Sequence, residues 1–62
     1  MNYVEVDVQI MHTRANAVLV SDGTTDAWIP KDALPDWDSS WGPGDYVIMS
    51  LPEEMAVEKG LV

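Results

Sequence analysis

A β-hairpin is encoded between residues 15 and 29, where the chain reads ANAVLVSDGTTDAWI. The apolar run of residues 15–20 predicts one strand, and residues 25–29 predict the returning strand. The four residues between them, Ser-Asp-Gly-Thr, are a strong turn signal, because glycine accepts the positive φ that tight hairpins require. Trp28 is then expected in the core or on the face of the hairpin. This segment indicates a β protein.

The flanking segments extend the β pattern. Residues 3–10 alternate strictly between valine or isoleucine and polar side chains, which predicts a half-buried strand with Glu5 and Asp7 on its outer face. Residues 45–51 predict a fourth strand. Pro30 is expected to end the third strand, because proline has no N–H to donate to a ladder.

The third predicted strand is followed by a short turn and a loop, and the fourth is followed by a short helix. Residues 31–34 are long enough for only one helical or 3₁₀ turn, with Leu34 expected in the core. Residues 35–44 are rich in turn-forming types and predict an exposed loop. Pro52 suits the first turn of a short C-terminal helix, and Gly60 suits its end. Within that helix, the acidic residues 53–54 and the basic residue 59 match the helix dipole.

These elements fit one domain over residues 1–62, because a chain this short forms a single core. The expected fold is mainly β: a small four- to five-stranded antiparallel barrel of the SH3 or OB kind with a short C-terminal helix. There is no cysteine, so neither a disulfide nor a Cys-rich zinc site can stabilise it. With 47% hydrophobic residues the chain is expected to fold despite its charge.

The charge is the strongest functional signal. Eleven Asp and Glu residues oppose three Lys and Arg residues, giving a formal net charge of -8. Such a surface repels nucleic acid and anionic membranes and attracts basic surfaces. No apolar run is long enough to span a membrane, and the N-terminal residues lack the pattern of a secretory signal. We therefore expect a soluble, cytoplasmic protein.

Two parts of the chain carry a resemblance. Residues 17–23 and 27–31 combine an apolar strand, an Asp-Gly turn and the motif Trp-Ile-Pro-Lys, and residues 51–61 carry a Pro-Glu…Glu-Lys-Gly-Leu ending. Together they resemble small uncharacterised bacteriophage and prophage proteins. Asp32 and Glu54 depart from that pattern, which has a serine and an aromatic residue there. The resemblance implies a phage origin, a bacterial host cytoplasm and a small β-barrel, and it implies no activity.

Catalysis and metal binding are not expected. His12 is the only histidine, and no nucleophile motif surrounds any serine, so a Ser-His-Asp arrangement has little support. Asp36 and Asp38 lie beside two serines and have the hard oxygen ligands that calcium prefers. The segment lacks the remaining ligands of an EF-hand loop, and capping of turns by these side chains is the favoured interpretation. We predict no enzyme activity, no cofactor and no metal.

The loop around Trp37 and Trp41 has two interpretations. Two tryptophans among carboxylates combine apolar anchors with a negative rim, as protein interfaces often do. Alternatively, one or both rings fold back over the small core.

The favoured hypothesis is a non-enzymatic acidic protein that occludes the basic, nucleic-acid-binding surface of a partner protein, as a DNA mimic that inhibits host defence. Direct binding of nucleic acid is disfavoured by the charge. The alternative is a small structural or accessory module that acts through homo-oligomerisation or within a phage assembly, using an edge strand or the apolar residues Met49, Met55 and Leu61. The predicted partner-binding residues are Glu5, Asp7, Asp22, Asp26, Asp32, Asp36, Trp37, Asp38, Trp41 and Asp45.

Overall fold

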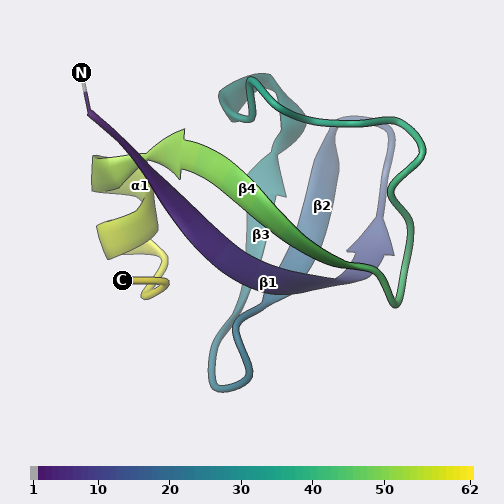
Figure 1. Cartoon of the computed structure of the whole chain (residues 1–62), viewed down its shortest axis with the longest axis horizontal. Helices are drawn as coiled ribbons and strands as arrows, with labels where there is room; N and C mark the ends of the chain where they lie inside the picture. Colours follow the sequence, from purple (N-terminus) through teal and green to yellow (C-terminus); the bar gives the residue numbers. More distant parts are fainter. Residues whose placement is uncertain (1) are drawn as a thin grey trace.

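A computed structural model describes residues 2–62 of the chain (Figure 1). The elements in chain order are β1 (Tyr3–Thr13), β2 (Ala17–Ser21), β3 (Asp26–Pro30), the 3₁₀ turn η1 (Lys31–Ala33), β4 (Tyr46–Pro52) and α1 (Glu53–Glu58). The predicted mainly β fold with four antiparallel strands and a short C-terminal helix is confirmed.

The four strands form one sheet in the order β3-β2-β1-β4. The long, bent strand β1 connects the two halves: its first part pairs with β4, and its last part pairs with β2 (Figure 1). The strands β3 and β4 are not hydrogen-bonded neighbours, so the sheet is open and has two edges. The strand pairing that would close a barrel is absent from residues 2–62.

The core lies on the concave side of the sheet. Alternate residues of each strand point inward and are buried, and Leu34, Ala56 and Leu61 complete the core from the segments outside the sheet. Trp37 and Trp41 are half-buried and pack against it. Apolar burial of this kind is the main favourable term in folding, and this chain has no disulfide to add to it.

The strand limits differ from the prediction in ways that the backbone explains. A bulge at Met11 shifts the register between Ile10 and His12, and β1 continues to Thr13 instead of ending at residue 10. Pro30 is the last residue of β3, because the ladder bond there comes from the next residue: the Lys31 N–H donates to the Asn16 carbonyl at 3.0 Å.

The C-terminal helix is short, and its two ends are well defined. Pro52 precedes α1 as the last residue of β4 and the N-cap, so it lies just outside the predicted first turn. Gly60 has a φ of 77°, which only glycine adopts readily, and the Leu61 N–H then donates to the Ala56 carbonyl at 2.8 Å. This geometry confirms the predicted cap and turns Leu61 into the core. Within residues 2–62, no helix has the length and apolar character needed to cross a membrane.

Candidate functional site

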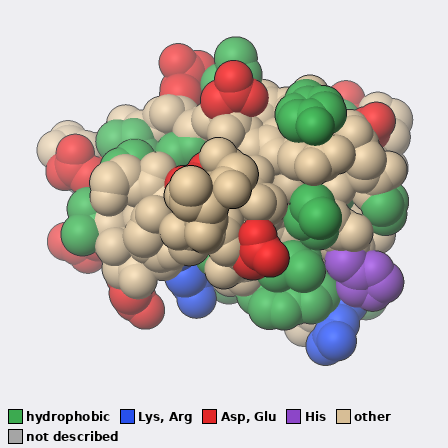
Figure 2. Space-filling model, turned by 90° about the horizontal axis from the view of Figure 1, so that it is seen from below, with side chains coloured by type: hydrophobic (Ala, Val, Ile, Leu, Met, Phe, Trp, Pro, Cys, Tyr) green, Lys and Arg blue, Asp and Glu red, His purple; other side chains and the backbone are tan. Residues whose placement is uncertain are grey.

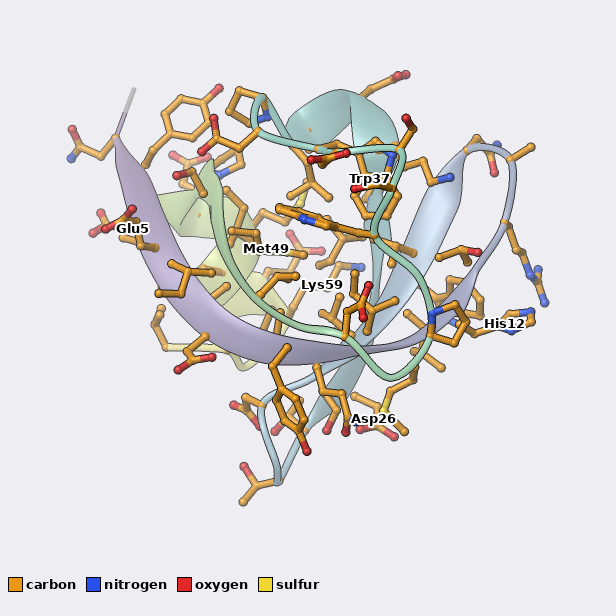
Figure 3. All side chains as sticks on the ribbon, turned by 45° about the vertical axis from the view of Figure 1, so that its right-hand side comes forward. Glu5, His12, Asp26, Trp37, Met49 and Lys59 are labelled. Carbon is orange, nitrogen blue, oxygen red and sulfur yellow. The ribbon has the colours of Figure 1, made fainter. Side chains whose placement is uncertain are left out.

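The structure divides the ten predicted binding residues between the four-stranded sheet with its β2–β3 turn and the segment that leads from β3 to β4. Four acids belong to the sheet: Glu5 and Asp7 on the outer face of β1, Asp22 in the β2–β3 turn, and Asp26 at the start of β3. The other six lie in η1 and in the loop that leads to β4, which returns to the sheet at Asp45: Asp32, Asp36, Trp37, Asp38, Trp41 and Asp45. Figure 3 shows Asp26 toward the lower end of the molecule and Trp37 in its upper half. The ten residues therefore do not form one patch.

The tryptophan loop contributes to the core. The rings of Trp37 and Trp41 meet edge to face, with centroids 5.5 Å apart, and both pack against the buried cluster. The Lys31 Nζ lies 4.8 Å from the centre of the Trp37 ring, a cation–π contact. The interpretation that the rings fold back over the core describes their packing, and their use as binding anchors stays a prediction.

Two loop carboxylates hold turns. The Ser40 N–H donates to Asp38 Oδ1 and the Gly42 N–H donates to Asp45 Oδ2, both at 2.9 Å. The backbone N–H of Ser40, followed by its side chain, lowers the pKa of Asp38 from its ordinary value. Within residues 2–62, no group of three or more His, Asp or Glu side chains is placed to hold a metal ion.

Asp22 organises the β2–β3 turn in the same way. Its Oδ1 accepts the N–H of Thr24 at 2.9 Å, the N–H of Thr25 at 2.8 Å and the Thr24 hydroxyl at 3.0 Å. These bonds, the Thr24 N–H first, lower the pKa of Asp22 from its ordinary value, because they stabilise the ionised carboxylate. Asp22 therefore adds negative charge at this end of the sheet, while its own oxygen is engaged by the turn.

A second surface combines acids with exposed apolar side chains. Glu5 and Asp7 project from β1, and Asp7 lies opposite Ile48 in the neighbouring strand β4. Ile48 is 62% exposed and Tyr46, on the same face of β4, is 77% exposed. Together with the exposed Tyr3, these residues define the β1–β4 face: Tyr3, Glu5, Asp7, Tyr46 and Ile48. It offers two carboxylates beside the exposed side chains of Tyr46 and Ile48, which are neighbours on one face of β4.

The β1–β4 face continues toward the hairpin turn. A shallow depression of about 310 Å³ lies beside it and is lined by residues that include Asp7, Gln9, Asp22 and Tyr46. Side chains from β1, β4 and the β2–β3 turn therefore border one surface. Of the predicted acids, Asp7 and Asp22 line this depression, and Glu5 lies two residues before Asp7 on the same face of β1.

Sequence reasoning missed Tyr46 and Ile48 as members of this surface. The available signal was the alternation within residues 46–52, which assigns Tyr46 and Ile48 to one face and Met49 to the other. The proposed apolar contact through Met49 and Leu61 is wrong, because the alternation of β4 turns Met49 inward and the Gly60 turn directs Leu61 into the core. Met49 is 1% exposed and Leu61 is buried, so both belong to the core.

Arg14 and His12 lie against the ring of Trp28. The Arg14 Cζ is 4.6 Å from the centre of the Trp28 ring, and the His12 ring meets Trp28 edge to face with centroids 6.0 Å apart. Trp28 thus lies on the outer face of the hairpin. Figure 3 shows His12 at the opposite end of β1 from Glu5, and in Figure 2 the histidine and a cation gather beside large hydrophobic side chains at one corner. Arg14, like Lys31, therefore lies against a tryptophan ring.

Comparison of the chain with protein-family models, with curated proteins and with solved structures finds no match. The resemblance to phage proteins accordingly stays a prediction from the sequence motifs. The evidence on function is the geometry and charge of the site.

Proposed function

We propose that this chain is a non-enzymatic acidic binding protein that occludes a basic surface of a partner protein through its β1–β4 face. The observation that carries the proposal is the position of Glu5 and Asp7 on one exposed strand face beside Tyr46 and Ile48. Arg14 and Lys31 lie on tryptophan rings instead of neutralising these acids. Charge and apolar area thus occur together on this face.

The geometry suits a surface that normally holds phosphates. Residues two apart on a strand are separated by about 6.8 Å, so Glu5 and Asp7 would present a short row of negative charges, as successive phosphates do along a nucleic-acid strand. Their negative charge would speed association, and the apolar contact of Tyr46 and Ile48 would slow dissociation.

The partner class that fits is a nucleic-acid-binding protein, because such proteins present basic grooves. The resemblance to phage proteins makes a host defence nuclease or a polymerase a suitable target, and the binding protein would then act in the bacterial cytoplasm as a DNA mimic. The acids of the tryptophan loop would add long-range attraction from the segment that leads from β3 to β4.

The test is capture of partners from bacterial lysate by the tagged protein, with duplex DNA as competitor. The variant Glu5→Lys/Asp7→Lys removes the acids of the β1–β4 face. The matched control Glu54→Lys/Glu58→Lys changes the net charge equally at two exposed positions of α1.

We expect the wild type and the α1 control to retain a nucleic-acid-binding protein that DNA displaces, and the β1–β4 variant to lose it. Equal loss in both variants would mean that net charge alone governs capture. Retention by both would show that the β1–β4 face is not the contact.

A structural or accessory module remains the alternative function. The observation that favours it is the exposure of Val57 in α1 and of Val62, 60% and 63%, which leaves apolar side chains at the helical end. Such a module would self-associate, and sedimentation velocity over a range of protein concentrations would detect it.

A further inference from the structure

We infer that the outer edge of β4 accepts an extended, basic segment of the partner as a fifth strand of the sheet. This inference rests on the proposed function and adds how the partner would be held. It follows from which backbone groups of β4 face outward, from the side chains of that edge and from the charges around it.

The register fixes which backbone groups of β4 face outward. The Glu53 N–H donates to the Asn2 carbonyl at 2.9 Å, and the Ile10 N–H donates to the Asp45 carbonyl at 2.8 Å. In an antiparallel ladder the hydrogen-bonded pairs alternate, so between these two bonds the odd-numbered residues of β4 bond to β1. The N–H and C=O groups of Tyr46, Ile48 and Ser50 therefore point away from the sheet.

The other edge of the sheet is less suited to pairing. The β2–β3 ladder alternates in the same way. Its register is set by two bonds, from the Asp22 N–H to the Thr25 carbonyl and from the Lys31 N–H to the Asn16 carbonyl. The backbone polar groups of Asp26, Trp28 and Pro30 therefore point away from β2, toward the open edge. Pro30 has no N–H, and Asp26 places a charge at the start of this short strand. Proline and charge on an edge are common protections against strand addition.

The edge of β4 lacks such protection along its length. Residues 46–52 read YVIMSLP and contain no charged side chain, and proline occurs only at the end. Asp45 precedes the strand and Glu53 follows it, so both ends of the edge are acidic. An exposed neutral edge strand with acidic ends selects an extended segment that carries positive charge.

A second copy of this chain is a poorer occupant than a basic segment. Antiparallel pairing of two β4 strands would bring Asp45 of one copy close to Glu53 of the other, at both ends of the interface. Each copy also carries a formal charge of -8. Like charges in these positions oppose pairing, whereas lysine or arginine in the added strand would be attracted.

The β1–β4 face supplies the side-chain contacts of the added strand. Outward side chains of that strand would lie beside Tyr46 and Ile48, with Asp7 one strand further away, at about 9.6 Å from the added backbone. A lysine or arginine can lay its aliphatic stem over Ile48 and direct its charge toward Asp7. The favoured segment therefore alternates basic side chains on the outer face with apolar side chains on the inner face.

The test uses an acetylated and amidated heptapeptide of alternating lysine and valine, together with an analogue methylated on the backbone nitrogens that would face β4. Both peptides have the same charge, and only the first can form ladder bonds. We expect the unmodified peptide to slow hydrogen exchange of the Tyr46, Ile48 and Ser50 amides, measured by NMR, and to leave that of Trp28 unchanged. The affinity of the methylated analogue is expected to be lower by a factor of about ten or more, because this peptide cannot form several of the backbone hydrogen bonds.

A pair of variants separates the edge from general electrostatics. Ile48→Lys places a charge on the edge, and Val57→Lys makes the same charge change at a comparably exposed position of α1. We expect Ile48→Lys to weaken binding of the unmodified peptide about tenfold and Val57→Lys to change it little.

Three results would overturn the edge inference. Equal affinity of the two peptides without amide protection would show binding by charge alone, and the proposed function would survive it. Absence of binding by either peptide would remove the inference about a basic strand, while lysate capture by the wild type decides the proposed function separately. Protection of the same three amides that grows with protein concentration and needs no peptide would show that a second copy occupies the edge.

Discussion

Two neighbouring residues of β4 are expected to lose very different amounts of stability when each is truncated to alanine. Met49 is 1% exposed in the core, and Ile48 is 62% exposed on the β1–β4 face. Replacing each by alanine removes a side chain of similar size from the same strand. The pair therefore tests the register of β4 and the exposure of the candidate site in one comparison.

The expected magnitudes follow from burial. A fully buried methionine truncated to alanine costs about 2–5 kcal/mol, through lost transfer energy and the cavity left behind. For Ile48, scaling the roughly 1.5–3 kcal/mol of a fully buried side chain by the small buried fraction gives about 1 kcal/mol or less. A domain of this size is stable by only about 3–9 kcal/mol, so Met49→Ala removes a large part of its free energy of unfolding.

The assay is urea unfolding followed by the fluorescence of the three tryptophans. We expect Met49→Ala to lower the midpoint much more than Ile48→Ala, with similar slopes, since the slope reports the surface exposed on unfolding. If Met49→Ala does not fold, Met49→Leu keeps the volume and should cost less than about 1.5 kcal/mol. Equal losses for Met49→Ala and Ile48→Ala would refute the assigned faces of β4 and the β1–β4 face with them.

Three further variants probe local features of the fold. Gly60→Ala is expected to cost about 1–2 kcal/mol in thermal unfolding, because the left-handed φ of 77° is unfavourable for any residue with a Cβ. Asp22→Ala should destabilise the protein at neutral pH. The pKa of Asp22 in the folded protein lies below its ordinary value of 3.8, so the stability that the ionised carboxylate contributes is complete above that value and is lost as the pH falls through the folded pKa. Unfolding measured over a pH series should therefore show the stability difference between Asp22→Ala and the wild type becoming smaller in acid. Arg14→Ala should cost about 0.5–1 kcal/mol by removing the cation from the Trp28 ring, and an unchanged midpoint in urea would show that this contact adds no stability.

Local sequence signals predicted the strands because the side-chain period of a strand is visible within a few residues. The alternation of residues 3–10 and the turn containing Asp22 and Gly23 are both local, and the structure confirms the elements. The bulge at Met11 was not visible, because a bulge is defined by the partner strand. The closure of the sheet also depends on pairing between distant segments, and β3 and β4 do not pair.

The candidate site was predicted only in part for a related reason. The sequence shows how many acids the chain has, and the path of the chain decides which of them meet. Glu5 and Asp7 were predicted on one outer face and lie there. Their apolar neighbours Tyr46 and Ile48 are some forty residues away in the chain, and only the β1–β4 register brings them together. Trp37 pairs with Trp41 against the core through loop geometry that local composition does not specify.

The core and the β1–β4 face arise from one alternating pattern in β1. Val6 is buried between Glu5 and Asp7, and its neighbours across the ladder alternate in the same way. A slip of the strand by one residue would bury both carboxylates and expose the valines, at a cost far above the stability of so small a domain. The register is therefore fixed by the core. The spacing and direction of Glu5 and Asp7 are held by the same packing, so the proposed contact face is preorganised, which would reduce the entropy lost on binding.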